Sequence, residues 1–89
     1  MTIAVTLTTG QNALSTSSEV VIAADTARNF AEVKNADASI SMYVGLDTNV
    51  TTSTGHLLKA GESFSFEHYT GAIWMIAASG TPTVTFIYW

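Results

Sequence analysis

Two histidines, His56 and His68, are the first residues of this sequence to consider for chemistry. They lie twelve positions apart, and neither belongs to an HxH or HExxH pattern, the spacings with which histidines commonly hold a metal ion. His68 directly follows Glu67 in a segment with strand character, so these two side chains would point to opposite faces. We interpret both histidines as surface or loop residues, and the sequence predicts no metal site.

The residue patterns of other active sites are also missing. No serine occupies a GxSxG turn, and the six glycines occur singly rather than in a loop that could hold a phosphate. Asp47-Thr48-Asn49 is similar to the start of a calcium loop, but the spaced acidic ligands and the terminal glutamate of such a loop are absent. The sequence therefore predicts no catalytic residues, no cofactor and no enzyme.

Aromatic side chains could instead stack on a sugar. Phe64, Phe66 and Trp74 lie in segments with the alternation of core strands, so we expect them inside the fold. Tyr43 and Tyr69 are better candidates for exposed stacking. They would be the contact residues if the chain were a carbohydrate-binding module.

Charge excludes two classes of partner. The sequence has three basic residues, Arg28, Lys34 and Lys59, and seven carboxylates, which gives a net charge of −4. Nucleic acid and anionic membranes both need clustered Lys and Arg, so we expect neither as a partner. Arg28 is expected to form a salt bridge with Glu32 or Asp25.

The length of 89 residues predicts one domain, residues 1–89, with little stability to spare. There is no cysteine to form a disulfide, so we expect self-association or docking on a larger surface to add stability. No leader sequence and no apolar run of about 20 residues is visible, so the chain is expected to assemble in the cytoplasm.

Alternation of apolar and polar residues predicts an all-β fold. Residues 2–8 form the first expected strand, which a turn at Thr9-Gly10-Gln11-Asn12 ends. Further strands are expected at residues 19–23, 28–34, 39–46, 56–58, 62–68, 72–78 and 83–89. A helix from Thr16 is the alternative for the second, although Val20-Val21-Ile22 favours a strand. Seven to eight short strands in this rhythm predict an antiparallel β-sandwich or jelly roll, with a small barrel as the alternative.

Three strands carry more specific expectations. Phe30 is expected to face inward, and the apolar run 72–78 is expected to be central and covered on both faces. In the last strand, Val84, Phe86 and Tyr88 share one face, whereas Ile87 and Trp89 lie on the other. This strand is either enclosed within the fold or directed with its outer face toward a neighbouring subunit.

Five motifs then follow one another along residues 20–89. They are Ala24-Asp25-Thr26-Ala27-Arg28-Asn29-Phe30, Glu32-Val33-Lys34-Asn35-Ala36-Asp37, Tyr43-Val44-Gly45, Lys59-Ala60-Gly61-Glu62 and Gly71-Ala72-Ile73-Trp74. Together they resemble a widespread type of small bacteriophage structural protein. The motifs belong to turns and core strands, so the resemblance implies a fold and a phage setting more than a particular role.

The resemblance implies a virion protein of the capsid decoration or cement type, which would bind the major capsid protein at capsomer junctions. A homo-oligomer, with a trimer favoured, would suit a threefold site. Residues 1–19 fit the pattern poorly and would be an added strand or an arm that reaches a neighbouring subunit. A tail or connector component and a carbohydrate-binding adhesin remain alternatives. The contact residues we expect are Thr2, Ile3, Val5, Leu7, Phe86, Ile87, Tyr88 and Trp89.

Overall fold

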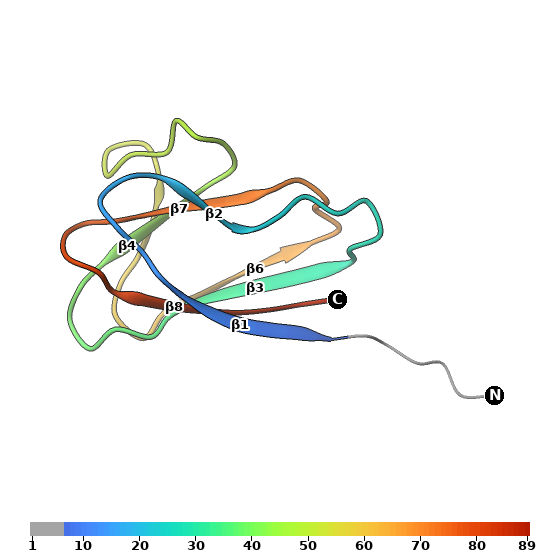
Figure 1. Ribbon diagram of the computed structural model, residues 1–89, viewed down its shortest axis with the longest axis horizontal. Helices are drawn as coiled ribbons and strands as arrows, with labels where there is room; N and C mark the ends of the chain where they lie inside the picture. The colour runs from blue at the N-terminus through green and yellow to red at the C-terminus, as the bar shows by residue number, and fades with distance from the viewer. Residues whose placement is uncertain (1–6) are drawn as a thin grey trace.

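Two β-sheets packed face to face make up the protein (Figure 1). The structure is a computed structural model that describes residues 7–89, and within this range it has eight strands. Each sheet has four strands, and every pairing between neighbours is antiparallel. The predicted all-β sandwich is confirmed. In this part of the chain no helix is long and apolar enough to cross a membrane.

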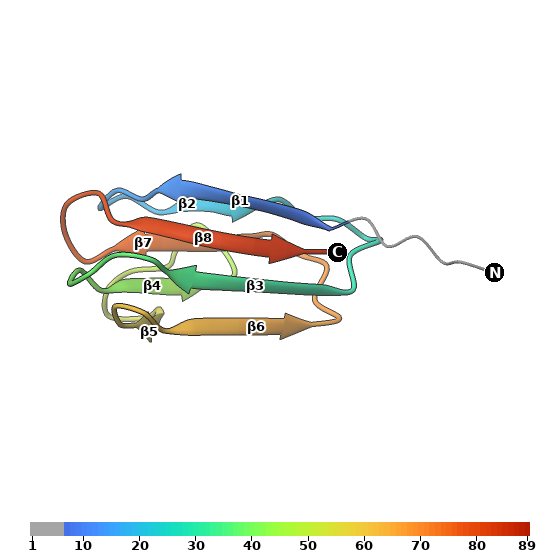
Figure 2. The same ribbon diagram turned by 90° about the horizontal axis from the view of Figure 1, so that it is seen from below.

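The strand order is that of a jelly roll (Figure 2). Sheet A has the order β1-β8-β3-β6, and its strands are β1 (Thr8–Ala13), β8 (Thr83–Tyr88), β3 (Phe30–Asn35) and β6 (Ser63–Glu67). Sheet B has the order β2-β7-β4-β5, and its strands are β2 (Glu19–Ile22), β7 (Ile73–Ala77), β4 (Met42–Gly45) and β5 (His56–Leu58). The last strand, β8, therefore lies inside sheet A between β1 and β3.

The core fills the space between the sheets. Alternate residues of each strand point into it, as the pleat of a strand requires. Its buried members are Leu14, Ile22, Ala31, Val33, Met42, Val44, Leu58, Ile73, Met75, Ala77 and Val84. Burying each of the larger side chains contributes about 1.5–3 kcal/mol, and this is the main term that holds the two sheets together.

Strand β1 corrects the expectation for the N-terminal part. The segment Thr9-Gly10-Gln11-Asn12 is not a turn, because it pairs with β8 along its whole length. Gly10 lies opposite Phe86, and the Phe86 Cζ atom is only 2.5 Å from where a Cβ on Gly10 would be. The aromatic ring supplies the apolar surface that β1 itself lacks. The strand predicted at residues 2–8 lies, up to residue 6, outside the described residues.

Two expectations about strand faces are wrong. Ala31 and Val33 are the inward residues of β3, so Phe30 lies on the outer face of sheet A. Strand β7 is central, as expected, but Trp74 and Ile76 are only half-buried. They point away from sheet A, and the second sheet can cover only one face of β7.

Arg28 holds several loops together at one end of the sandwich. It is 3% exposed, and it donates hydrogen bonds to the backbone carbonyls of Ala23, Tyr69 and Gly71. The expected salt bridge is replaced by these carbonyls, because Asp25 instead accepts from the N–H of Ala27 at 2.9 Å. The other expected partner, Glu32, accepts from the Ser65 hydroxyl at 3.0 Å.

Candidate contact surfaces

The four C-terminal residues predicted as contacts divide between two environments. Phe86 and Tyr88 point into the sandwich and pack against the core. Ile87 lies on the outer face of sheet A, where it pairs with Thr9 of β1 and Glu32 of β3. Only Ile87 and Trp89 of this group are therefore placed to meet a partner on the outer face.

A small apolar patch forms at one end of that face. Trp89 continues the β8 ladder, since its N–H and C=O both bond to the main chain of Phe30 at 3.0 Å. The two rings stack with their centroids 4.5 Å apart. Leu7 precedes Thr8, the partner of Tyr88, so it lies at the same end of the sheet. Leu7 is 55% and Trp89 is 37% exposed.

We call the set Leu7, Phe30, Ile87 and Trp89 the Trp89 patch. Three of its members were predicted as contacts from the sequence, and the structure brings these three to one face. Phe30 was missed because its position in the alternation suggested an inward side chain. The other predicted contacts, Thr2, Ile3 and Val5, lie outside the described residues.

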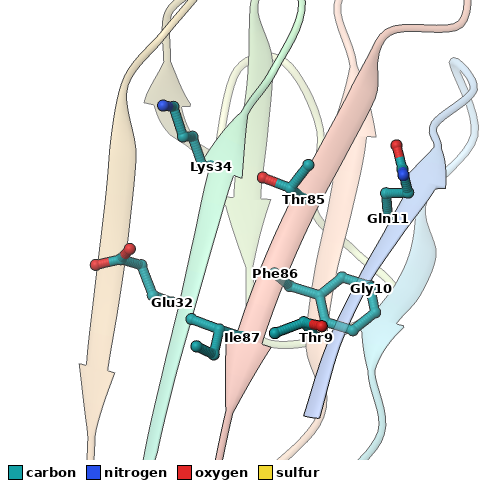
Figure 3. Close-up of a pocket in the computed structure, with 8 residues that line it drawn as sticks. All are labelled: Thr9, Gly10, Gln11, Glu32, Lys34, Thr85, Phe86 and Ile87. Atoms are coloured by element: carbon teal, nitrogen blue, oxygen red, sulfur yellow. The ribbon is translucent and has the colours of Figure 1, made fainter. Parts of the chain in front are cut away.

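A shallow groove of about 390 Å³ crosses sheet A beside the patch (Figure 3). Its lining combines hydroxyl, amide and charged groups with the apolar side chain of Ile87. The residues are Thr9, Gly10, Gln11, Glu32, Lys34, Thr85, Phe86 and Ile87. The groove offers hydrogen-bond donors, acceptors and both signs of charge across the three neighbouring strands β1, β8 and β3, so it can hydrogen-bond a polar ligand group.

The two tyrosines predicted for sugar stacking do not form one platform. Tyr69 donates its hydroxyl to the carbonyl of Ala72 at 3.0 Å, and its ring packs against the core. The guanidinium of Arg28 lies 6.0 Å from the centre of that ring. Tyr43 is half-buried on the outer face of sheet B, opposite Leu57 and Ile76. Tyr69 thus belongs to the turn that Arg28 fixes.

The outer face of sheet B is a second apolar surface, which sequence reasoning missed. Val20 is 41% and Leu57 is 39% exposed. The half-buried residues Tyr43, Trp74 and Ile76 share this face with them. The nearly continuous apolar run of β7 was the signal that could have revealed it, since it requires cover on both sides.

Both histidines are exposed, as expected. His56 lies against Phe64 with ring centroids 4.7 Å apart, and His68 directly follows β6 and has a left-handed φ of 60°. Among residues 7–89, no group of three or more His, Cys, Asp or Glu side chains could hold a metal ion.

No protein-family model matches the sequence, and no curated protein matches it. Three solved structures have a similar fold. The first is the stem and receptor binding domain of spike protein P1 from bacteriophage PM2, with a TM-score of 0.66 and 19% identity. That match covers 90% of this chain and 32% of the other, so this chain spans about a third of the spike structure.

The other two are similar over most of both chains. The SPBc2 prophage-derived protein YomS has a TM-score of 0.54 and 14% identity, and the match covers 99% of this chain and 98% of that one. A protein of the Bacillus endospore appendages, described as disulfide-linked pili, has a TM-score of 0.54 and 10% identity, with 94% and 84% covered. At these identities the comparisons establish the fold: this chain is a β-sandwich of the kind found in a phage spike, a prophage protein and a pilus.

Proposed function

We propose that this chain is a non-enzymatic structural subunit of a phage particle, and specifically a capsid decoration protein. The observation that carries the proposal is the similarity of the whole jelly roll to a phage spike domain and to a prophage protein. The motifs at residues 20–89, which resemble small phage structural proteins, support the same setting. On this proposal the chain resides in the virion and binds the major capsid protein at capsomer junctions.

The Trp89 patch is the surface we assign to the capsid contact. Aromatic residues with partly exposed rings concentrate binding energy at protein interfaces, and Trp89 and Phe30 are stacked and so already ordered before contact. The polar groove beside the patch would form the wetter rim of such an interface. Three copies around a threefold axis would present three such patches to one junction.

A cosedimentation experiment tests this proposal. Purified chain is added to phage shells that lack it, and the bound fraction is measured for the wild type, Trp89→Ala and Leu57→Ala. Leu57 is a matched control, because it is 39% exposed against 37% for Trp89 but lies on the outer face of sheet B. We expect Trp89→Ala to weaken binding by about tenfold or more, and Leu57→Ala to have little effect. Absence of binding by the wild type, or a larger loss for Leu57→Ala, would contradict the proposal.

A receptor-binding role is the second candidate, and the groove on sheet A is the observation that favours it. The first structural neighbour contains a receptor binding domain, and the groove offers the amide, hydroxyl and charged groups that hold a sugar. A glycan array tests this role. Binding that is lost in Gln11→Ala but kept in Tyr43→Ala would support the groove, whereas loss in Tyr43→Ala would return attention to the tyrosines.

A further inference from the structure

Within residues 7–89, strand β6 is an edge strand, and the main-chain groups on its outer side have no partner among these residues. At its two ends, Asn35 N–H donates to the carbonyl of Glu62 at 2.9 Å and His68 N–H donates to the carbonyl of Asn29 at 2.8 Å. Even-numbered residues therefore bond toward β3. Because main-chain groups alternate in direction along an antiparallel strand, Ser63, Ser65 and Glu67 direct their N–H and C=O groups to the free edge.

The apolar side of β6 is also incompletely covered. Phe64 and Phe66 point toward the core but remain half-buried, and their ring centroids are 4.9 Å apart. The row of rings continues at both ends. The ring centroid of His56 lies 4.7 Å from that of Phe64, and the centroid of Tyr69 lies 5.8 Å from that of Phe66. Figure 2 shows β5 and β6 together at this side of the sandwich. An added strand would pair with the free edge and cover these rings at once.

The other three edge strands among residues 7–89 are less suited to pairing. Strand β5 has three residues, and β2 has an irregular register between Val20 and Ile22. On the side of β1 and β2, the Asn12 amide donates to the carboxylate of Glu19 at 3.4 Å, so polar groups close the sandwich there. Strand β6 has five residues in unbroken register with β3, and neither proline nor lysine guards it.

Residues 1–6 have the sequence of a matching strand. The apolar residues Ile3 and Val5 alternate with Thr2, Ala4 and Thr6. No side chain in the segment is charged, so the segment would bring no negative charge close to Glu62 and Glu67 at the two ends of β6. Fully extended, six residues span about 20 Å, which is about the length of β6. With Ala4 opposite Ser65, Ile3 and Val5 would cover Phe66 and Phe64.

The partner strand has to come from another copy. In sheet A, β1 and β6 are separated by β8 and β3, so the distance between them is three strand spacings, or about 14 Å. A segment that begins before Leu7 would use most of its reach to cross that distance within its own chain. A neighbouring molecule can place the segment along β6 directly.

We propose that residues 1–6 of one copy add as a strand to the free edge of β6 in a second copy. The contact is heterologous, because the segment of one copy meets a different surface, the β6 edge, of the next copy, so three copies can close into a ring. The inference concerns how copies join, and it is tested on the purified chain. Its failure would therefore leave the proposed role in the virion open to its own test.

The acceptor side is tested with two substitutions at one position. Ser65→Pro removes the N–H that faces the free edge while leaving the β3 ladder intact, and Ser65→Ala removes only the hydroxyl that bonds to Glu32. Sedimentation velocity over a concentration series measures self-association, and circular dichroism checks folding. We expect Ser65→Pro to weaken association by about tenfold or more and Ser65→Ala to stay within about threefold. A wild type that is monomeric throughout, or equal losses in both variants, would overturn the proposal.

The donor side provides a complementation test. Ile3→Asp places a charge in the apolar row, whereas Thr6→Asp places the same charge on the opposite face, across from Ser63, and serves as the control. Ser65→Pro keeps a functional segment and Ile3→Asp keeps a functional edge. We expect each of these two variants to be monomeric alone and to form a one-to-one dimer when mixed. A mixture that remains monomeric, with both variants folded, would overturn the proposal.

Discussion

Arg28 shows how a single buried charge can organise loops without a carboxylate partner. Its guanidinium donates to three backbone carbonyls from two segments that are far apart in the sequence. We predict that Arg28→Met lowers the free energy of unfolding by about 3 kcal/mol, because three buried carbonyls lose a charged donor. Urea denaturation measures this loss, with Lys34→Met as an exposed control. A loss no larger than that of the control would contradict this role.

The carboxylate of Asp37 makes the stability of the fold depend on pH. Its carboxylate accepts from the N–H of Ile40 at 2.7 Å and of Ser39 at 2.9 Å, and these bonds lower the pKa of Asp37 from its ordinary 3.8, with the Ile40 bond the larger cause. A lowered folded-state pKa adds stability that is present above the unfolded pKa and is lost as the pH falls through the folded pKa.

We therefore predict that the stability difference between the wild type and Asp37→Asn is largest above roughly pH 4 and shrinks at lower pH. Urea unfolding at a series of pH values measures it. A difference that does not change with pH would show that the carboxylate charge has no part in this turn.

Residue roles were the hardest part to predict from the sequence. The sequence shows the carboxylates near Arg28 directly. The carbonyls of Tyr69 and Gly71 lie more than forty positions away, and because they belong to the backbone, no residue type indicates that they bind Arg28. Asn35 directly follows the strand predicted at residues 28–34, so it was expected outside that strand. It is instead fully buried at the end of β3, where its amide donates to the carbonyls of Ile40 and Leu58 at 2.8 and 2.9 Å.

At the scale of elements, strands with clear alternation were predictable and β1 was not. The inward residues of β1 are Thr8, Gly10 and Asn12, so the strand has no apolar row of its own. Its stability depends on Phe86 from β8, a tertiary contact that no local pattern contains. The central position of β7 was predicted because a long apolar run is typical of such strands.

The pairing of β1 with β8 depends on the close approach of Gly10 to the Phe86 ring. A Cβ at position 10 would meet the Phe86 ring at 2.5 Å, so we expect Gly10→Ala to destabilise the fold by about 1–3 kcal/mol. In a Phe86→Leu background the smaller side chain leaves room, and the same substitution should cost less. A double-mutant cycle by urea denaturation measures the coupling. If the stability losses of the two substitutions simply add, a side chain at position 10 does not collide with the Phe86 ring.

At the scale of the whole molecule, the sequence predicted the sandwich but not which surfaces face outward. Leu7, Ile87 and Trp89 were predicted as contacts, and the strand order brings them to one face. That grouping depends on β8 lying between β1 and β3, which is a property of the jelly roll and not of any segment. The same strand order leaves β6 at the edge of sheet A, which no single segment of the sequence predicts.

The copy number of this chain in purified phage particles shows whether it decorates the capsid. Quantitative mass spectrometry would compare the chain with the major capsid protein. A decoration protein is expected to be abundant, and we predict a ratio near one to one. A handful of copies per particle would contradict the capsid assignment and place the chain in the tail or at a vertex. Its absence from the particles would contradict the structural role in the virion altogether.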